Sequence, residues 1–382
     1  MSLPRPSRLS WLLNRAMLLD LWRSLGRFLK APLDSVAFRI LRLLFSQVRT
    51  PAQTLLLLRL DGIGDLLFFA RYLESLRQAF SGYKVILVCR EEVAELAEQL
   101  NGFDAVLPLK ARKYQWNYAY RVSFLSRLRS NRPHMTIYLS YHRRHIGDEI
   151  ALLSGAPTVV AFNGNTEIIR AGTKSRNDKY YTALVDVPDH VPEQMRYVRL
   201  AEFLGVPLYA SNVWSTSRQA NPKQVAVIAP GSTSSMRRWP AHRFAEVADT
   251  VAGTFGFKIV LCGDGSQGKL LRKVSSLMSW PRELMEGAPM REVVDLIGSS
   301  RLLIGNDSGL LHVAGVLNTP AVGIVGGGHF SRYFPYGRMK VVTNPLDCFE
   351  CNWKCRYRRP YCVTDISTES VVAAVYDVLA EQ

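Results

Sequence analysis

A glycine-rich turn near the start of the chain carries the first candidate functional residue. The segment from Arg59 to Leu67 (RLDGIGDLL) follows a run of leucines, and the apolar spacing after it predicts a helix. Asp65 then lies in the first helical turn, where the helix dipole favours the ionised carboxylate. Because ligands of open α/β sheets bind at the carboxyl ends of strands, this turn is a candidate site. The alternatives are an ordinary helix-start aspartate and a dinucleotide-binding turn, which would need a third glycine where the chain has Leu67.

Two turns in the second half of the chain carry groups that can bind an anion. The segment 230–240 (PGSTSSMRRWP) places hydroxyl groups and two arginines ahead of a predicted helix, and these groups can donate hydrogen bonds to a phosphate. In the segment 306–312 (NDSGLLH), the backbone N–H groups of a predicted helix N-terminus supply a second anion site. A polar surface loop, a plain N-cap and a packed histidine are the alternatives. The candidate ligand-binding residues are Ser232, Thr233, Arg237, Asp307, Ser308, Gly309 and His312.

Four of the six cysteines lie close together near the C-terminus, at Cys348, Cys351, Cys355 and Cys362. Thiolates at this density are typical of a structural zinc or iron site, and four sulfur ligands leave no open position for a substrate. The residues between them include no aliphatic side chain, so this loop cannot build a core for itself. The alternative is a set of ordinary reduced thiols. Cys89 and Cys262 stand alone in predicted strands.

The net charge of +16 is concentrated in two segments, residues 1–50 and 110–144, and the rest of the chain is balanced. A protein coated with positive charge for nucleic acid would have a wider distribution, so no nucleic-acid partner is expected. In 110–144, aromatic and basic residues interleave, which suits stacking on sugar rings and pairing with the acidic groups of an anionic glycan. A nucleic-acid surface and a solvated helix are the alternatives. The candidate residues for binding such a glycan acceptor are Arg112, Lys113, Arg143 and Arg144.

The first 50 residues predict two helical pieces, 10–31 and 33–48, separated by Pro32. The first piece has a basic and an apolar face. In the second, the predicted apolar face comprises Leu33, Val36, Ala37, Ile40 and Leu44, with Arg39 and Arg42 facing away. This extension either packs on the protein or lies on an anionic lipid surface. Because the chain shows neither a run of 18 uncharged apolar residues nor a cleavable signal, a cytosolic location is expected.

The elements that must position these residues are short apolar runs that alternate with helical patterns. Such runs occur at 55–59, 84–89, 105–108, 135–139 and 158–162, and again at 225–229, 258–262, 302–305 and 321–325. Most are continuously apolar, as parallel strands buried on both faces require. The sequence therefore predicts an α/β protein with two Rossmann-like domains, at 51–208 and 225–382, joined by a polar linker at 209–224 and preceded by the helical extension at 1–50.

Three motifs in order, GIGDLL, PGS followed by RRWP, and NDSGLLHVAG followed by TPAVGI, resemble those of glycosyltransferase family 9. The best-known members of this family are the ADP-heptose:lipopolysaccharide heptosyltransferases, and the resemblance covers roughly residues 54 to 380. It implies the GT-B fold, in which the first domain binds the acceptor and the second binds the nucleotide sugar, here ADP-heptose. It also implies transfer to lipopolysaccharide or another surface glycan, by an enzyme that works at the cytoplasmic face of the bacterial inner membrane.

The resemblance also implies roles for the candidate residues. Asp65 matches the general base of the family. Ser232, Thr233 and Arg237 match residues around the donor diphosphate, and Arg237 replaces the usual lysine. The donor-binding turn matches Asp307, Ser308, Gly309 and His312, with Ser308 in place of the usual threonine. An inverting sugar transfer needs one carboxylate to accept a proton, and cationic groups or dipoles to stabilise the departing diphosphate, so no catalytic metal is expected.

The chain departs from the family pattern in two loops. Residues 326–332 (GGGHFSR) stand where the lipopolysaccharide-core enzymes usually have Phe-Gly-Pro, and the segment 266–268 (SQG) lacks an acidic residue that is common there. The four-cysteine segment, 348–362, is similar to that of iron-binding heptosyltransferases that modify autotransporter adhesins. Transfer of heptose to an autotransporter protein, or transfer of a different sugar to an O-antigen, is therefore an alternative. A non-catalytic module that binds membrane or RNA is the alternative from another class.

Overall fold

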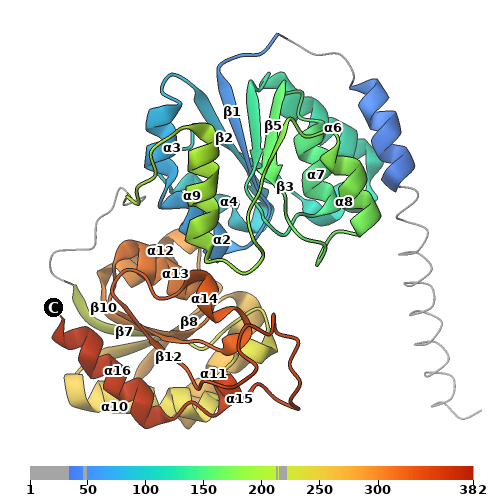
Figure 1. Ribbon diagram of the computed structural model, residues 1–382. Coiled ribbons are helices and arrows are strands. Elements are labelled where there is room, and N and C mark those ends of the chain that lie inside the picture. Colours follow the sequence, from blue (N-terminus) through green and yellow to red (C-terminus); the bar gives the residue numbers. More distant parts are fainter. Residues whose placement is uncertain (1–33, 46–49, 212–213, 215–221, 382) are drawn as a thin grey trace, which may run out of the picture.

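The computed structural model describes residues 34–45, 50–211, 214 and 222–381 (Figure 1). It contains two parallel six-stranded sheets with helices packed around each of them. The predicted α/β class with two Rossmann-like domains is confirmed. The predicted helix over 10–31 lies outside the described residues. Within the described ranges, no helix has both the length and the apolar character needed to cross a bilayer.

The first sheet has the strand order β3-β2-β1-β4-β5-β6. Its strands are β1 (Thr54–Arg59), β2 (Lys84–Arg90), β3 (Ala105–Leu109), β4 (Met135–Tyr138), β5 (Thr158–Phe162) and β6 (Ala183–Val185). The central strand β1 is buried along its whole length, which explains its continuous run of leucines. The sequence predicted five of these strands, and it missed β6 because an apolar run of three residues is too short to indicate a strand.

The second sheet has the strand order β12-β11-β10-β7-β8-β9, the same arrangement read from the other edge. Its strands are β7 (Lys223–Ala229), β8 (Lys258–Gly263), β9 (Arg282–Glu286), β10 (Ser300–Asn306), β11 (Ala321–Ile324) and β12 (Met339–Val342). The sequence missed β9 and β12, which lie at the two edges, and β9 is mostly exposed. In each sheet the strand order reverses beside the first strand, and the turns after β1, β7 and β10 carry the candidate residues. Such a reversal is where open α/β sheets bind ligands.

Helices connect the strands and cover both sheets (Figure 1). In the first domain they are α2 (Ile63–Ala70), α3 (Leu73–Ala79), α4 (Glu91–Glu98), α5 (Ala111–Trp116), α6 (Tyr118–Ser130), α7 (His145–Leu152), α8 (Ala171–Asp178) and α9 (Glu193–Leu204). In the second domain they are α10 (Ala241–Phe255), α11 (Gly268–Leu277), α12 (Met290–Ser299), α13 (Gly309–Leu317), α14 (Phe330–Tyr333), α15 (Tyr361–Thr364) and α16 (Thr368–Ala380).

A helix over 34–44 packs on the outside of the first domain. It lies within the second predicted piece, but Val36, Ile40 and Leu44 of the predicted apolar face are not on the side that packs on the domain. Phe38 and Leu41 enter the core, whereas the apolar side chains of Val36, Ile40, Leu43 and Leu44 are 52 to 75% exposed. An ion pair between Asp34 and Arg121 of α6, 3.3 Å long, holds the start of the helix in this orientation. The sequence could not predict the rotation, because it depends on a partner 87 residues away.

The two domains meet through the carboxyl ends of their central strands. The N-terminus of α2 lies against the N-terminus of α13: Ile63 contacts Gly309, and a Cβ at Gly64 would collide with the ring of His312. One cluster of buried apolar side chains contains residues of both sheets, among them Leu57 and Val227. The interface between the domains is therefore a continuous apolar seam, and the candidate site lies along it.

Candidate active site

Asp65 lies at the start of α2, as predicted. Gly62 is the N-cap of this helix, and its backbone N–H donates to Asp65 Oδ2 at 3.1 Å. The three following apolar residues, Leu66, Leu67 and Phe68, are buried. These apolar residues thus hold one side of α2 in the core. The Asp65 carboxylate lies at the N-terminus of the helix, where it faces the second domain.

The other oxygen of Asp65 receives donors from both domains. The Nη2 atoms of Arg59, at the end of β1, and Arg332, on α14, lie 3.3 and 3.4 Å from Asp65 Oδ1. The hydroxyl of Tyr333, also on α14, donates a short hydrogen bond to the same oxygen. Three donors thus crowd Oδ1 while Oδ2 accepts one, and two of these four donors come from the second domain.

Glu193 of α9 pairs with both arginines that contact Asp65. Its carboxylate is buried and lies 3.1 Å from Arg59, 2.9 Å from Arg196 and 3.1 Å from Nε of Arg332. Arg332 thus bridges Asp65 and Glu193 across the domain interface. Charge pairing of this kind compensates the desolvation of buried ions.

The charges around the site set the protonation of its carboxylates. Burial alone would raise the pKa of Asp65, but Arg59, Arg332, the Tyr333 hydroxyl and the Gly62 N–H outweigh it and hold the pKa well below its usual value. Burial is likewise outweighed at Glu193, where Arg332, Arg59 and Arg196 lower the pKa. Both carboxylates are therefore ionised at neutral pH, which is the state that a proton acceptor needs.

The predicted donor turns lie side by side in the second domain. Ser232 is buried and its hydroxyl donates to the backbone carbonyl of Asp307 at 3.1 Å. Nη1 of Arg237 lies 3.5 Å from the Asp307 carboxylate. Asn306 joins the same turns by donating to the Pro230 carbonyl at 2.7 Å. Thr233, in contrast, is exposed. The two turns thus form one continuous surface, and the hydrogen bonds between them stabilise it.

The start of α13 provides an anion site with a polar side chain beside it. Ser308 is the N-cap, and its hydroxyl is buried without a hydrogen-bond partner among the described residues. His312, one turn later, is buried, and its Nδ1 lies 2.8 Å from the Tyr336 hydroxyl. Burial lowers the pKa of His312 to about 4, so the ring is neutral at pH 7. The free N–H groups of the helix and the Ser308 hydroxyl can together bind a phosphate.

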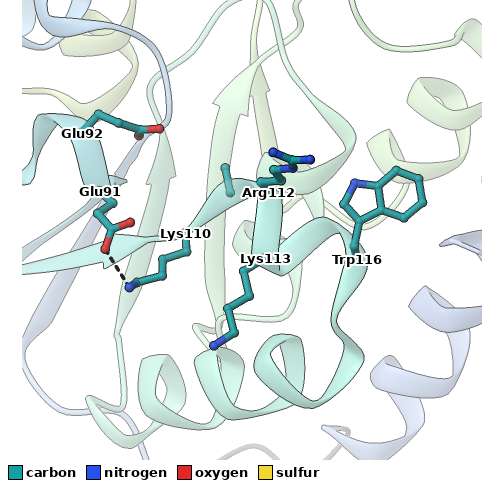
Figure 2. A pocket seen from close by; sticks show the side chains of 7 residues that line it. Glu91, Glu92, Lys110, Arg112, Lys113 and Trp116 are labelled. Atoms are coloured by element: carbon teal, nitrogen blue, oxygen red, sulfur yellow. Dashed lines mark ion pairs between the residues drawn. The ribbon is translucent and has the colours of Figure 1, made fainter. Parts of the chain in front are cut away.

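The predicted acceptor residues do not form one group. Arg112 and Lys113 line a surface pocket of about 610 Å³ at the carboxyl ends of β2 and β3, together with Glu91, Lys110 and Trp116 (Figure 2). Arg144 is exposed elsewhere, at the start of α7. Arg143 is fully buried and pairs with Asp148, at 3.5 Å, and with Asp178. Arg143 is therefore not available on the surface in this structure.

Cys348, Cys351 and Cys355 lie in the loop between β12 and α15, and Cys362 lies in α15 itself. Cys348, Cys351 and Cys355 are half-buried, Cys362 is buried, and none is in a disulfide. Burial, followed by interactions with the other three cysteines, raises the pKa of Cys362. Four thiols suit zinc or iron chemically, but within the described ranges no group of three or more His, Cys, Asp or Glu side chains is arranged to hold a metal ion. We therefore derive no chemical step through a metal.

The sequence did not identify several residues of the site: Arg59, Glu193, Arg332 and Tyr333. The position of Arg59 at a strand end, within the glycine-rich segment, was a usable signal. Arg332 and Tyr333 lie in or beside the loop that departs from the family pattern, which marked the place but not the contact. Glu193 has no local signal, because its partners are far away in the sequence.

Comparison with known proteins finds sequence similarity in the second half of the chain. Residues 202–358, which include both donor turns, match the sequence model "Glycosyltransferase family 9 (heptosyltransferase)". Lipopolysaccharide heptosyltransferase 2 of Escherichia coli K12 is 26% identical over 153 residues, which cover 38% of this chain and 43% of that protein. The chain thus matches less than half the length of this curated relative.

Solved structures show the same fold over most of the chain. ADP-heptose lps heptosyltransferase II of E. coli has a TM-score of 0.67 at 16% identity, covering 86% of this chain and 99% of that one. The iron-containing dodecameric glycosyltransferase TibC of enterotoxigenic E. coli has a TM-score of 0.54 at 16% identity, covering 88% and 78%. The chain is therefore similar to these heptosyltransferases in fold, and its residues 202–358 are similar in sequence to glycosyltransferase family 9.

Proposed function

We propose that this protein is an inverting glycosyltransferase that transfers heptose from ADP-heptose to lipopolysaccharide or another anionic surface glycan. One observation carries the proposal: the Asp65 carboxylate, at the start of α2, faces the start of α13 across the domain interface, where the Ser308 hydroxyl is buried without a partner among the described residues. Base and donor site are thus contributed by different domains and lie next to each other. A non-catalytic module would not need this arrangement of Asp65 with two intact donor turns.

The proposed reaction uses only groups of this chain and its substrates. Asp65 accepts the proton of the acceptor hydroxyl, whose oxygen attacks the anomeric carbon of the sugar while the bond to the diphosphate breaks. The N–H groups of α13, the Ser308 hydroxyl and Arg237 stabilise the charge that develops on the departing diphosphate. Attack from the side opposite the leaving group inverts the anomeric centre.

The pocket on the first domain is the proposed acceptor subsite. Trp116 is 59% exposed and offers a flat apolar ring for a sugar. Arg112 and Lys113 lie on the same helix, α5, and are suited to a phosphate or carboxylate of the acceptor. Lys110 is already paired with Glu91 at 3.0 Å, so it contributes less to this charge (Figure 2).

The helix over 34–44 supports a peripheral location on an anionic membrane surface. Its outward side combines four exposed apolar residues with Arg39, as interfacial helices do. We propose that this side contacts the cytoplasmic face of the inner membrane, where a glycolipid acceptor would be presented.

A structural zinc or iron at the four cysteines remains a proposal of the same kind. Elemental analysis of protein purified without chelator should find close to one metal ion per chain, and Cys351→Ser should lose it. Metal-free wild-type protein with unchanged activity would show that the four thiols act without a metal.

The proposed function is tested by screening nucleotide sugars with the purified protein. A bound donor raises the melting temperature, because it stabilises only the folded state. The donor that gives the largest rise is then incubated with lipopolysaccharide, with O-antigen or with an autotransporter protein, and mass spectrometry identifies the product. ADP-heptose and lipopolysaccharide should give transfer. Transfer to protein would move the activity to another acceptor, and the absence of any transfer would contradict the proposal.

A further inference from the structure

Helix α14 brings two side chains of the second domain onto the carboxylate that the proposed mechanism uses. Tyr333 donates its hydroxyl to Asp65 Oδ1, and Arg332 lies 3.4 Å from the same atom. Arg59 is a third donor to Oδ1, whereas Oδ2 accepts only the Gly62 N–H, so Oδ1 is the crowded oxygen of this carboxylate. A general base must hydrogen-bond the hydroxyl that it deprotonates, so an acceptor hydroxyl that binds Oδ1 has to take the place of one of these three donors.

Tyr333 is the donor whose departure costs the site least. Arg59 and Arg332 both bind Glu193 as well as Asp65, and the Gly62 N–H belongs to the helix start. Tyr333, in contrast, makes its only described hydrogen bond to Asp65. Its ring packs edge-on against Phe68 and His312, with ring centroids 5.4 and 5.3 Å apart. The side chain thus fills the space between the two domains directly in front of the base.

A turn of the four-cysteine loop holds α14 from behind. The backbone N–H groups of Glu350 and Asn352 donate to the carbonyls of Gly327 and Gly328, at 2.6 and 3.0 Å. The Glu350 carboxylate accepts the N–H of Ser331 at 2.9 Å. Glu350 and Asn352 have left-handed backbone angles, with φ of 63° and 50°, which are uncommon outside glycine. Because all these contacts lie within the second domain, they survive when Tyr333 leaves Asp65.

We propose that Tyr333 is a displaceable cap on the general base: its hydroxyl occupies the position at Asp65 that the acceptor hydroxyl takes during transfer. The inference rests on the proposed function. Its consequence is protection of the donor. A water molecule at this position would give its proton to Asp65 and attack the anomeric carbon, releasing the free sugar and the nucleoside diphosphate. The cap denies water that position until an acceptor displaces it.

The charges around Asp65 agree with such an exchange. Arg59 and Arg332 are the cations that act on it, Asp61, Glu193 and Asp307 are the anions nearby, and Arg237 pairs with Asp307. The neutral groups nearby are Tyr197, His312 and Tyr333. Loss of the Tyr333 hydrogen bond removes one of the contacts that lower the pKa of Asp65. The acceptor hydroxyl donates in place of the phenol, so the exchange keeps a hydrogen bond on Oδ1, and Arg59 and Arg332 still hold the carboxylate ionised.

The test compares Tyr333→Phe and Tyr333→Ala with the wild-type protein and with Tyr376→Phe, a matched change on the exposed face of α16. Release of nucleoside diphosphate is measured without acceptor, and transfer is measured over a range of acceptor concentrations. Tyr333→Phe removes only the hydrogen bond, whereas Tyr333→Ala also opens the space. We expect hydrolysis per transfer to rise several-fold in the first variant and on the order of tenfold in the second. The KM for the acceptor should fall in Tyr333→Phe, while the donor dissociation constant and the Tyr376→Phe values stay unchanged.

A purely structural role for Tyr333 would lower transfer and leave hydrolysis per transfer unchanged, and that result overturns the cap. If Tyr333→Ala does not fold, as judged by its melting curve, Tyr333→Phe alone decides the question. Failure of the proposed function has a different signature, because no nucleotide sugar would then be consumed in an Asp65-dependent way. Asp65-dependent transfer with unaltered Tyr333→Phe kinetics would refute the cap and leave the transferase assignment intact.

Discussion

The two helix starts that face each other in this molecule differ in how their polar groups are satisfied. At α2, the Asp65 carboxylate accepts hydrogen bonds or charge contacts from four groups of the protein. At α13, the Ser308 hydroxyl is buried with no such partner among the described residues. A ligand at the start of α13 would therefore break none of the described hydrogen bonds of Ser308, whereas a ligand that binds Oδ1 of Asp65 would replace a donor of the protein. Under the proposed function, the donor would bind to a prepared surface and the acceptor would compete with Tyr333 for its place.

The largest effect is expected from the carboxylate itself. Asp65→Asn should lower kcat on the order of 10² to 10⁴-fold, because it removes the proton acceptor but keeps the shape of the side chain. Donor binding, measured by the shift in melting temperature, should stay nearly unchanged, since the donor turns belong to the other domain. Asp377→Asn, on the exposed face of α16, is the control. Full activity of Asp65→Asn would show that this carboxylate of the first domain is not the proton acceptor.

The donor side is tested through its cation. Arg237→Ala should weaken nucleoside diphosphate binding by about 1.5 to 3 kcal/mol, the range of a hydrogen bond to a charged group. Affinity for the nucleoside alone should barely change, and isothermal titration calorimetry measures both. An equal loss for the two ligands would mean that Arg237 contacts something other than the diphosphate.

The histidine between the two helix starts links stability to pH. Because burial lowers the pKa of His312 to about 4, the unfolded state binds its proton first as the pH falls. Its contribution to stability is thus fully present above about pH 6.5 and declines toward pH 4, by up to about 1.4 kcal/mol per pH unit.

Urea unfolding between pH 7 and pH 4.5 measures this slope. A His312→Gln variant should be less sensitive to pH than the wild-type protein, whereas His190→Gln, at an exposed position, should have the wild-type slope. Equal slopes for all three proteins would contradict a buried neutral His312.

A smaller effect tests the difference between the starts of α2 and α13 most directly. Ser308→Ala should leave the melting temperature of the ligand-free protein unchanged, because the hydroxyl makes no hydrogen bond to lose. Donor affinity should fall by about 0.5 to 1.5 kcal/mol, the range of a neutral hydrogen bond. A clear drop in the melting temperature without ligand would mean that Ser308 is already bonded within the protein.

The weakest expected effect concerns the outer surface of the first domain, at the helix over 34–44. Replacing Ile40 and Leu44 together by serine should reduce sedimentation with anionic liposomes several-fold and leave transfer to a soluble acceptor intact. Phe203→Ser, an equally exposed apolar position on α9, is the control. Wild-type sedimentation should also fall with added salt, because the arginine contribution is screened. Unchanged sedimentation would leave this helix as a packed extension.

The sequence predicted the parts of the site that depend on local pattern. Asp65 and the turns at Ser232 and Ser308 follow strands directly, so an apolar run, a glycine and a polar residue sufficed to locate them. Contacts between residues far apart in the chain were not predictable. Glu193 contacts Arg332, 139 residues away, and Tyr333 contacts Asp65, 268 residues away, and no local pattern shows either contact.

Charge patterns alone located residues of the candidate site less reliably than the ends of predicted strands did. The basic segment 110–144 contributed Arg112 and Lys113 to a surface pocket, but the same segment placed Arg143 in a buried ion pair with Asp178, 35 residues further on. A formal charge in the sequence does not reveal whether it faces solvent or a partner. The identity of that partner depends on how β4, α7 and α8 pack.

The apolar seam between the domains bears on how the molecule unfolds. Buried side chains of both sheets belong to one cluster, so separating the halves would expose apolar surface on each of them. Two sheets with the same strand order would otherwise be able to melt one after the other. With the seam, loss of one half removes support from the other, and calorimetry should record a single cooperative transition instead of two.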